Sequence, residues 1–148
     1  MITSEWLGRG AHTGRQIAQL TSELHEGTFA ITPAQHLVVK DPPPGQNLQD
    51  SMTGMELGLN ILADEAATFI HQARDSHGMN ELRADVQDAG RISGAARREV
   101  EALTGKPVVS PVNYKQLRQE RQRQLQASLF EETVNEIADQ LEREDADD

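Results

Sequence analysis

The stretch DAGRISGAARREVEALTGKPVVSPVNY, from Asp88 to Tyr114, gives the strongest indication of how this 148-residue chain folds. Its first half continues a pattern in which apolar or small residues step by four and three positions in turn: Leu82, Val86, Ala89, Ser93, Ala96, Val100 and Leu103. That spacing is typical of one face of an α-helix. We expect Asn80 to cap this helix and Gly105 to end it.

The middle of the predicted helix carries almost no side-chain bulk, because it contains Ala89, Gly90, Ser93, Gly94, Ala95 and Ala96. A glycine inside a helix costs about 1 kcal/mol relative to alanine. Two glycines four residues apart are tolerated where another backbone approaches that face closely, so we predict close helix packing. The alternative is a ligand groove lined by glycines, but the strand, glycine-rich turn and helix N-terminus of a phosphate site do not surround this segment.

A second amphipathic helix is predicted upstream. Thr53 and Glu56 have the spacing of a capping box, in which the threonine oxygen accepts an amide hydrogen bond and the glutamate reaches back to the cap. The apolar residues that follow also step by four and three positions, and the expected buried stripe is Met55, Leu59, Leu62, Ala66, Phe69 and Ala73. This pattern predicts a helix of about six turns with the stripe facing the core.

Before this helix, the segment Asp41–Asp50 (DPPPGQNLQD) contains three consecutive prolines. Proline fixes φ and has no amide donor, so neither a helix nor a central strand is expected to pass through the segment. Further upstream, we expect Thr13 to cap a helix that ends near Gly27. Residues 32–40 begin with a Thr-Pro pair and predict a short helix.

After Gly105, the segment KPVVSPVNY is typical of an extended connector, and Asn113 is expected to cap a long helix from about Tyr114 to Leu141. The first half of this helix is polar nearly all round. The second half places four apolar residues at spacings of 4, 3 and 4, and they are Phe130, Val134, Ile137 and Leu141. We expect such a helix to leave the body before it buries this seam. A second copy of the chain is the most available partner, so we predict a homodimer in which this helix crosses between subunits.

These elements predict an all-α fold, a compact helical domain with a long C-terminal helix used for dimerisation. The expected organisation is a helical body at 1–112 and a C-terminal helix with an acidic tail at 113–148. Within the body we expect N-terminal helices at 1–40, a proline-rich linker at 41–50, and a helical pair with its connector at 51–112.

The net charge of −10 is concentrated at the C-terminus. Nine acidic residues and one arginine from Glu131 to Asp148 contribute −8, which leaves −2 for the first 130 residues. Such a tail is typical of a solubilising end; less often it guards a basic surface or imitates nucleic acid. The chain has no cysteine, no apolar run near the roughly 20 residues that span a bilayer, and no signal-peptide pattern at its start. We therefore expect a cytoplasmic protein without membrane association.

His71, Asp75 and His77 suggest a metal site at first, because His71 and Asp75 share a helix face. No glutamate accompanies a two-histidine motif and no second ligand cluster follows, so solvated surface is the preferred interpretation. The remaining histidines lie apart in the sequence, without a nucleophile and an acid spaced as a unit: His12, His25 and His36. We expect no enzymatic activity, no metal site and no cofactor.

Basic residues recur from position 91 to position 123, and they are Arg91, Arg97, Arg98, Lys106, Lys115, Arg118, Arg121 and Arg123. Together they could form a strip that contacts phosphates or a protein partner. Against this, Glu99, Glu101 and Glu120 are interleaved with them, and Tyr114 is the one aromatic residue in the range. The alternative is a set of solvated faces with ion pairs such as Arg97–Glu101.

Four short patterns occur in a fixed order: an Asn-x-x-Asp-x-Met entry, a Glu-Leu pair, a Gly-Arg before a basic helix, and a Gly-then-Pro exit. They are formed by Asn47, Asp50, Met52, Glu56, Leu57, Gly90, Arg91, Gly105 and Pro107. With them, the segments Gln46–Thr68 and Asp88–Tyr114 resemble the C-terminal, non-BRO portion of DNA-damage-inducible protein D and of related BRO-type phage antirepressor-like proteins. The resemblance implies a role in the DNA-damage response, including modulation of recombinase filaments on single-stranded DNA, or in phage-type transcriptional switching.

We therefore expect a non-enzymatic protein-interaction module in the DNA-damage response or in mobile-element regulation, with a recombinase or a repressor as its partner. One alternative is a protein that binds nucleic acid directly through the strip from Arg91 to Arg123. Another is an antitoxin-like protein whose acidic tail blocks a basic toxin. Salt-dependent DNA binding would distinguish the nucleic-acid alternative from the other two.

Overall fold

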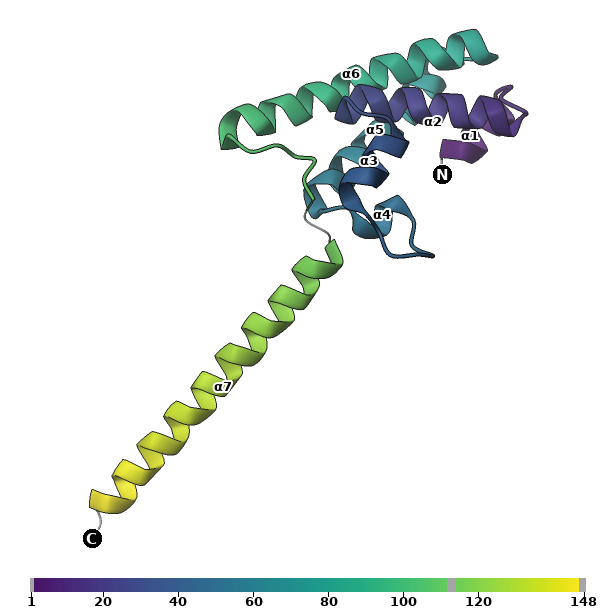
Figure 1. Cartoon of the computed structure of the whole chain (residues 1–148). Coiled ribbons are helices and arrows are strands. Elements are labelled where there is room, and N and C mark those ends of the chain that lie inside the picture. Colours follow the sequence, from purple (N-terminus) through teal and green to yellow (C-terminus); the bar gives the residue numbers. More distant parts are fainter. Residues whose placement is uncertain (1, 112–113, 147–148) are drawn as a thin grey trace. The chain divides into compact units, whose positions relative to one another are not determined.

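The computed structural model describes residues 2–111 and 114–146, with side chains at 2–111 and 122–146. These residues form seven helices (Figure 1): α1 (Ile2–Gly8), α2 (Gly14–Phe29), α3 (Pro33–Lys40), α4 (Leu48–Ser51), α5 (Gly54–Arg74), α6 (Met79–Thr104) and α7 (Tyr114–Ala146). No strand occurs within the described ranges, which confirms the all-α prediction. The chain divides into two compact units, Met1–Asn113 and Tyr114–Asp148.

Local sequence signals start most of the helices of the first unit. Thr13, Thr32 and Thr53 each accept a hydrogen bond from the backbone N–H three residues on, and the residue at that position bonds back to the cap backbone. These capping boxes satisfy amides that have no partner inside the helix. The predicted starts of α2, α3 and α5 are confirmed.

Two predicted helix ends need correction. α6 begins after Gly78 rather than Asn80, because Gly78 takes φ +82° and its amide donates to the Arg9 carbonyl at 2.8 Å. α2 continues through Gly27 to Phe29 and ends at Ala30, whose φ of +62° is left-handed. Gly27 is therefore an interior helix residue, and its role is packing rather than termination.

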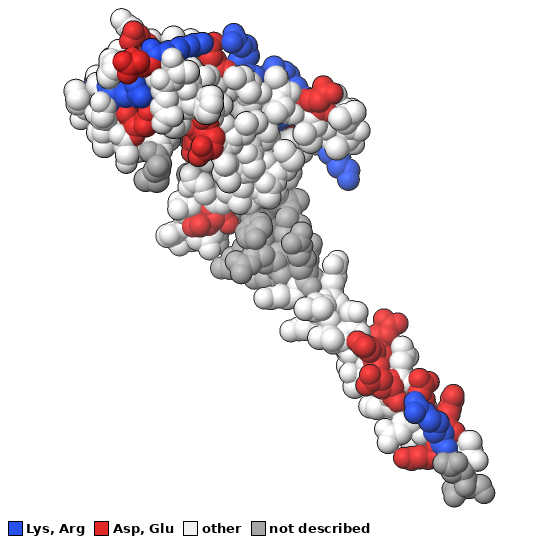
Figure 2. Space-filling model, turned by 180° about the vertical axis from the view of Figure 1, so that it is seen from behind, with Lys and Arg blue, Asp and Glu red and all other residues white. Residues whose placement is uncertain are grey.

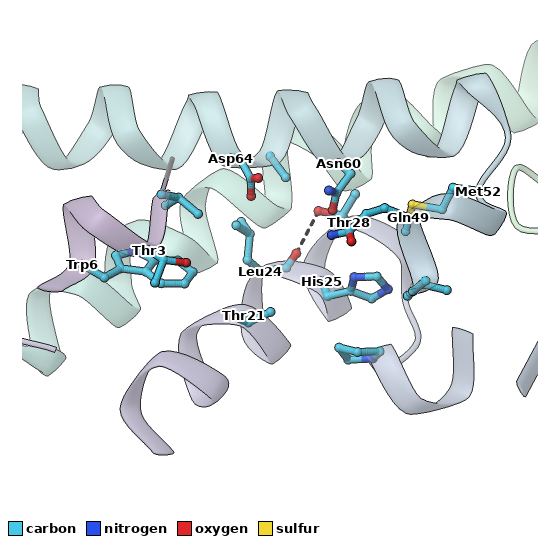
Figure 3. Close-up of a pocket in the computed structure, with 14 residues that line it drawn as sticks. Thr3, Trp6, Thr21, Leu24, His25, Thr28, Gln49, Met52, Asn60 and Asp64 are labelled. Carbon is cyan, nitrogen blue, oxygen red and sulfur yellow. Dashed lines mark hydrogen bonds between the residues drawn. The ribbon is translucent and has the colours of Figure 1, made fainter. Parts of the chain in front are cut away.

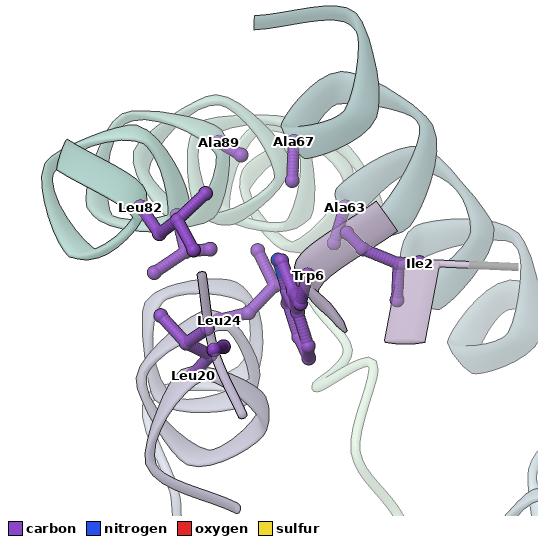
Figure 4. Close-up of a cluster of buried hydrophobic side chains, with 10 residues drawn as sticks. Ile2, Trp6, Leu20, Leu24, Ala63, Ala67, Leu82 and Ala89 are labelled. Carbon is purple, nitrogen blue, oxygen red and sulfur yellow. The ribbon is translucent and has the colours of Figure 1, made fainter. Parts of the chain in front are cut away.

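The main core lies between α1, α2, α5 and α6. Its buried residues are Ile2, Trp6, Ala11, Leu20, Leu24, Ala63, Ala67, Leu82, Val86 and Ala89. Figure 4 shows Trp6 of α1 among side chains from α2 and α5. Trp6 is 1% exposed and is the single tryptophan of the chain. Because α1 has only seven residues, it is anchored by this tertiary contact, which no sequence pattern predicts.

α2 and α6 cross at three glycines. A Cβ on Gly27 would lie 2.7 Å from the Cα of Gly90, and one on Gly94 would lie 2.2 Å from the Gly27 carbonyl oxygen. Beside the crossing, the Thr28 and Ser93 hydroxyls are hydrogen-bonded at 2.7 Å. The small-residue face of α6 therefore packs against the backbone of α2. This confirms the predicted close packing and rules against the alternative of a glycine-lined ligand groove.

The predicted stripe of α6 is buried through its first half, where Leu82, Val86, Ala89 and Ser93 are all enclosed. Towards the end of the helix, Val100 is only partly buried and Leu103 is 79% exposed. Leu103 continues the helical pattern but lies outside the core. Val108, in the connector, instead completes a second, smaller cluster with Phe29, Met52 and Leu59.

The predicted stripe of α5 is wrong. The buried face of the helix consists of Glu56, Leu59, Ala63, Ala67 and His71. Of the residues expected inside, only Leu59 is fully buried, whereas Met55 is 42%, Leu62 38% and Phe69 77% exposed. Hydropathy misses the true face because it carries a carboxylate and an imidazole that are hydrogen-bonded inside the protein, along with two alanines that let neighbouring helices approach.

Candidate interaction surfaces

α7 exposes an apolar seam along its second half. Every side chain described from 122 to 146 is exposed, and this includes Phe130 (73%), Val134 (47%), Ile137 (54%) and Leu141 (57%). We call these four residues the α7 seam. Their spacing of 4, 3 and 4 places them on one side of the helix. The helix runs to Ala146, five residues beyond the predicted end, because neither glycine nor proline interrupts this segment.

Acidic residues flank the α7 seam. Glu131, Glu132 and Glu136 lie beside it, and Figure 2 shows acidic side chains over much of the C-terminal half of this helix. A surface that is both apolar and acidic attracts apolar partners, but two copies of it repel one another electrostatically. Salt screens such repulsion between exposed charges.

The basic residues singled out in the sequence are divided between the two units. Arg91, Arg98 and Lys106 are exposed on the first unit, and Arg91 pairs with Asp88 at 2.9 Å. Arg123 is exposed on α7, whereas the side chains of Lys115, Arg118 and Arg121 lie outside the described residues. Figure 2 shows basic and acidic side chains interleaved at one end of the first unit. A common basic strip stays a prediction.

Arg97 differs from the other predicted strip residues because its side chain is engaged inside the protein. It is partly buried, its Nε donates to the Thr28 carbonyl at 2.8 Å, and its guanidinium pairs with Glu101. The ion pair is the one suggested by the sequence spacing. Arg97 therefore ties the end of α6 to the end of α2, a structural role that leaves its guanidinium little capacity for phosphate.

A second apolar surface lies between α5 and α6, where Phe69 and Ile92 are exposed while Ala66 and Ile70 are partly buried against the main core. Glu65, Ala66, Phe69, Ile70 and Ile92 line a shallow open pocket between α5 and α6. We call this the α5–α6 apolar patch. Its exposed aromatic and aliphatic side chains are of the kind that protein interfaces bury. Ala66 and Phe69 belong to the stripe predicted from helical spacing, so part of that stripe lies on this surface.

His25, His36 and His71 are buried. His25 and His36 lie apart in the sequence but are in contact in the fold. His25 Nε2 lies 2.9 Å from His36 Nδ1, and His36 Nε2 is hydrogen-bonded to Glu56. Lys40 forms an ion pair with the second oxygen of that carboxylate. A carboxylate needs a donor on the nearest nitrogen, so His36 Nε2 carries a proton and donates it to Glu56.

The electrostatics of this cluster lower the pKa of two of its groups, and this favours the neutral form of His25 and the charged form of Glu56. Burial, and next the neighbouring His36, lower the pKa of His25 to about 4, so His25 is neutral at neutral pH. Burial acts to raise the pKa of Glu56, but the hydrogen bonds from His36 and Lys40 outweigh it and lower that pKa. The Glu56 capping box was predicted, but its burial against α3 was not.

His71 lies in a separate buried cluster that joins α1, α5 and α6. Trp6 Nε1–H can only donate, and it donates to His71 Nε2 at 3.0 Å. His71 is therefore neutral, with its proton on Nδ1 and donated to Asp85 at 2.9 Å. The expectation of a solvated His71 is wrong, because the side chain is 0% exposed.

Asp85 gathers three donors in this second cluster. Burial acts to raise its pKa, but hydrogen bonds from Ser76, His71 and Arg74 outweigh burial and hold that pKa below its ordinary value. Although a serine, a histidine and an aspartate meet here, Ser76 donates to the aspartate and not to the histidine. His71 Nε2, the atom a general base would use, is occupied by Trp6. These hydrogen bonds hold α1, α5 and α6 together, which is a structural role.

The exposed pair His77–Asp75, 3.2 Å apart, lies outside this cluster. Across the described ranges, no group of three or more histidine, aspartate or glutamate side chains is placed to hold a metal ion. Nor does any described helix combine the length and apolar character needed to cross a membrane.

Comparison with known proteins gives no relative for this arrangement. No family model, curated protein or solved structure matches the chain.

Proposed function

We propose that this protein is a non-enzymatic protein-interaction module that forms a homodimer through the α7 seam. The observation that carries the proposal is the exposure of Phe130, Val134, Ile137 and Leu141 on one side of a 33-residue helix. Helices whose apolar residues recur in this way are stabilised when a partner helix buries them. Because the rest of α7 is largely polar, its own sequence gives it little other stabilisation.

A second copy is favoured as the partner because a closed, two-fold dimer lets one sequence supply both sides of the interface. Each copy would place its four seam residues against the same residues of the other copy. The acidic flanks weaken this contact without preventing it, since apolar burial acts at short range and the repulsion is screened by salt.

Light scattering coupled to size-exclusion chromatography tests the dimer. The unmodified chain is expected to have twice the monomer mass at tens of micromolar, and Val134→Asp with Ile137→Asp is expected to give the monomer. The matched control, Leu125→Asp with Ser128→Asp, adds the same two charges at least about 120° around the helix from the substituted seam positions. It should leave the dimer intact. A monomer mass for the unmodified chain, or equal dissociation by both variants, would contradict the proposal.

We further propose that the dimer acts in the DNA-damage response or in mobile-element regulation, with a recombinase or a repressor as its partner. The support is the resemblance of Gln46–Thr68 and Asp88–Tyr114 to the C-terminal portion of DNA-damage-inducible protein D. The test is the fluorescence anisotropy of labelled single-stranded DNA carrying a bacterial recombinase filament, with and without this protein. A change in filament stability supports the role. Salt-dependent binding to the DNA without recombinase would instead favour direct nucleic-acid binding.

A further inference from the structure

A cavity in the first unit is lined by residues of α1, α2, α3, α4 and α5 (Figure 3). Its volume is about 310 Å³, which suits a small organic molecule. One part of its wall is apolar and includes Leu24, Met52 and Ala63, while Trp6 contributes its ring. Neither exposed interaction surface described above shares residues with this cavity.

Polar side chains also converge on the cavity. Asn60 and Asp64 lie one helical turn apart on α5 and extend towards α2 in Figure 3, and Gln49 approaches from α4. Within the described residues, none of these three side chains forms a hydrogen bond or an ion pair. Such groups in a concave site are the usual means by which a protein orients a ligand.

The charged side chain that lines the cavity is a carboxylate. Among the described residues that line it, Asp64 is the only aspartate, glutamate, lysine or arginine. His25 also lines the cavity, but its pKa of about 4 leaves it neutral at neutral pH. Burial, and next the neighbouring Glu65, raise the pKa of Asp64. The positive charge of the chain's N-terminus acts to lower that pKa but does not outweigh them, so the carboxylate stays poorly solvated. A cation placed beside this carboxylate would relieve that cost.

We propose that the cavity binds a small organic cation, an alkyl- or arylammonium ion whose ammonium group pairs with Asp64. The amide oxygens of Asn60 and Gln49 can accept its remaining N–H donors, because an ammonium has three donors and no acceptor. Its apolar body would lie against Leu24 and Met52, near the ring of Trp6. This inference is independent of the α7 dimer.

Trp6 provides the readout, since it is the only tryptophan and it lines the cavity. Benzylammonium is the probe, and benzyl alcohol and benzoate are its neutral and anionic counterparts. The expected result is a saturable change in tryptophan fluorescence with benzylammonium, a weaker response with benzyl alcohol, and none with benzoate. A matching rise in melting temperature with benzylammonium would show that the probe binds the folded state.

Two isosteric variants separate the cavity from general surface charge. Asp64→Asn should weaken benzylammonium binding by about tenfold or more, because it removes the charged acceptor. Glu65→Gln removes the adjacent charge, which lies outside the cavity lining, and should change binding less than about twofold. Circular dichroism melts of both variants establish that they fold.

Three outcomes would overturn the proposal: no saturable response to any probe, equal binding of benzyl alcohol and benzylammonium, or unchanged binding to a folded Asp64→Asn variant. If Asp64→Asn fails to fold, benzoate and benzylammonium binding to the unmodified protein still decide the sign of the charge. Preferential binding of benzoate would then contradict the proposal.

Discussion

At the scale of single residues, Gly94 is the glycine with the least room for a side chain among those of the described residues. Its missing side chain admits the Gly27 carbonyl oxygen, which would lie 2.2 Å from an added Cβ. Gly94→Ala is expected to destabilise the protein by about 1–3 kcal/mol, although alanine has the better helix propensity by about 1 kcal/mol. Denaturant unfolding followed by circular dichroism measures the change.

Gly58 is the matched control for this substitution. It lies inside α5, it is exposed, and an added Cβ would meet nothing within 4 Å. Gly58→Ala should therefore stabilise the protein by up to about 1 kcal/mol through helix propensity alone. If both alanine variants were stabilised, the close approach of α2 and α6 would be wrong.

His25 gives a second prediction at this scale, on the pH dependence of stability. Its pKa is lowered from 6.5 to about 4 in the folded protein, so the unfolded chain takes up the proton first as pH falls. Its contribution to stability is complete above about pH 6.5 and decreases towards pH 4, by about 2 kcal/mol after allowance for partial solvation.

Denaturant unfolding at about pH 7 and at about pH 4.5 tests this linkage. His25→Gln keeps a donor for His36 but cannot titrate, so its loss of stability across this range should be smaller than that of the unmodified chain. The exposed His12 is the control, and His12→Gln should retain the full pH dependence. Identical pH profiles for His25→Gln and the unmodified protein would show that His25 is not buried in its neutral form.

At the scale of elements, the buried face of α5 differs from the stripe predicted from the sequence, and stability measurements can test this difference. Leu59 and Phe69 both belonged to the expected stripe, yet one is 2% and the other 77% exposed. Leu59→Ala is expected to cost about 2–5 kcal/mol, as buried leucines do, whereas Phe69→Ser should change stability by less than about 0.5 kcal/mol. Equal losses in thermal or chemical unfolding would restore the original stripe.

The helices were largely predictable because their signals are local. Capping boxes, the glycine at 105 and the spacing along α6 act within a few residues of the backbone they control. The identity of the face that each helix buries is not local. Glu56 and His71 are inside only because Lys40, His36, Trp6 and Asp85, distant in sequence, provide their hydrogen bonds.

Of the candidate sites, some are predictable from local sequence and others depend on contacts between distant helices. The α7 seam is predicted from residue spacing alone, and its four residues are exposed. The cavity beside Asp64 could not be anticipated, since its walls come from five separate helices. Gly27 as the partner of Gly90 and Gly94 is similarly a tertiary fact: three unremarkable glycines become a contact only when α2 and α6 cross.

At the scale of the whole molecule, charge and assembly are coupled. The chain carries −10 overall, and the nine acids and one arginine from Glu131 to Asp148 account for −8 of it. In the proposed dimer these charges are brought close to their copies. Raising the salt concentration should therefore tighten the dimer, in contrast to an interface made of opposite charges, which salt weakens.

Removal of residues 142–148 separates the tail from the seam. This segment contains five acids and one arginine, so its loss changes each chain by +4 while all four seam residues remain. We expect the truncated chain to dimerise more tightly at low salt and to respond less to added salt, because the repulsion has been reduced. Sedimentation equilibrium at about 20 and 500 mM salt measures both effects.

The melting transition of the first unit should not move, since every side chain described in the removed segment is exposed. A weaker dimer after truncation would mean that the acidic residues contribute attractive contacts, and that the partner of α7 presents basic groups rather than a second acidic helix.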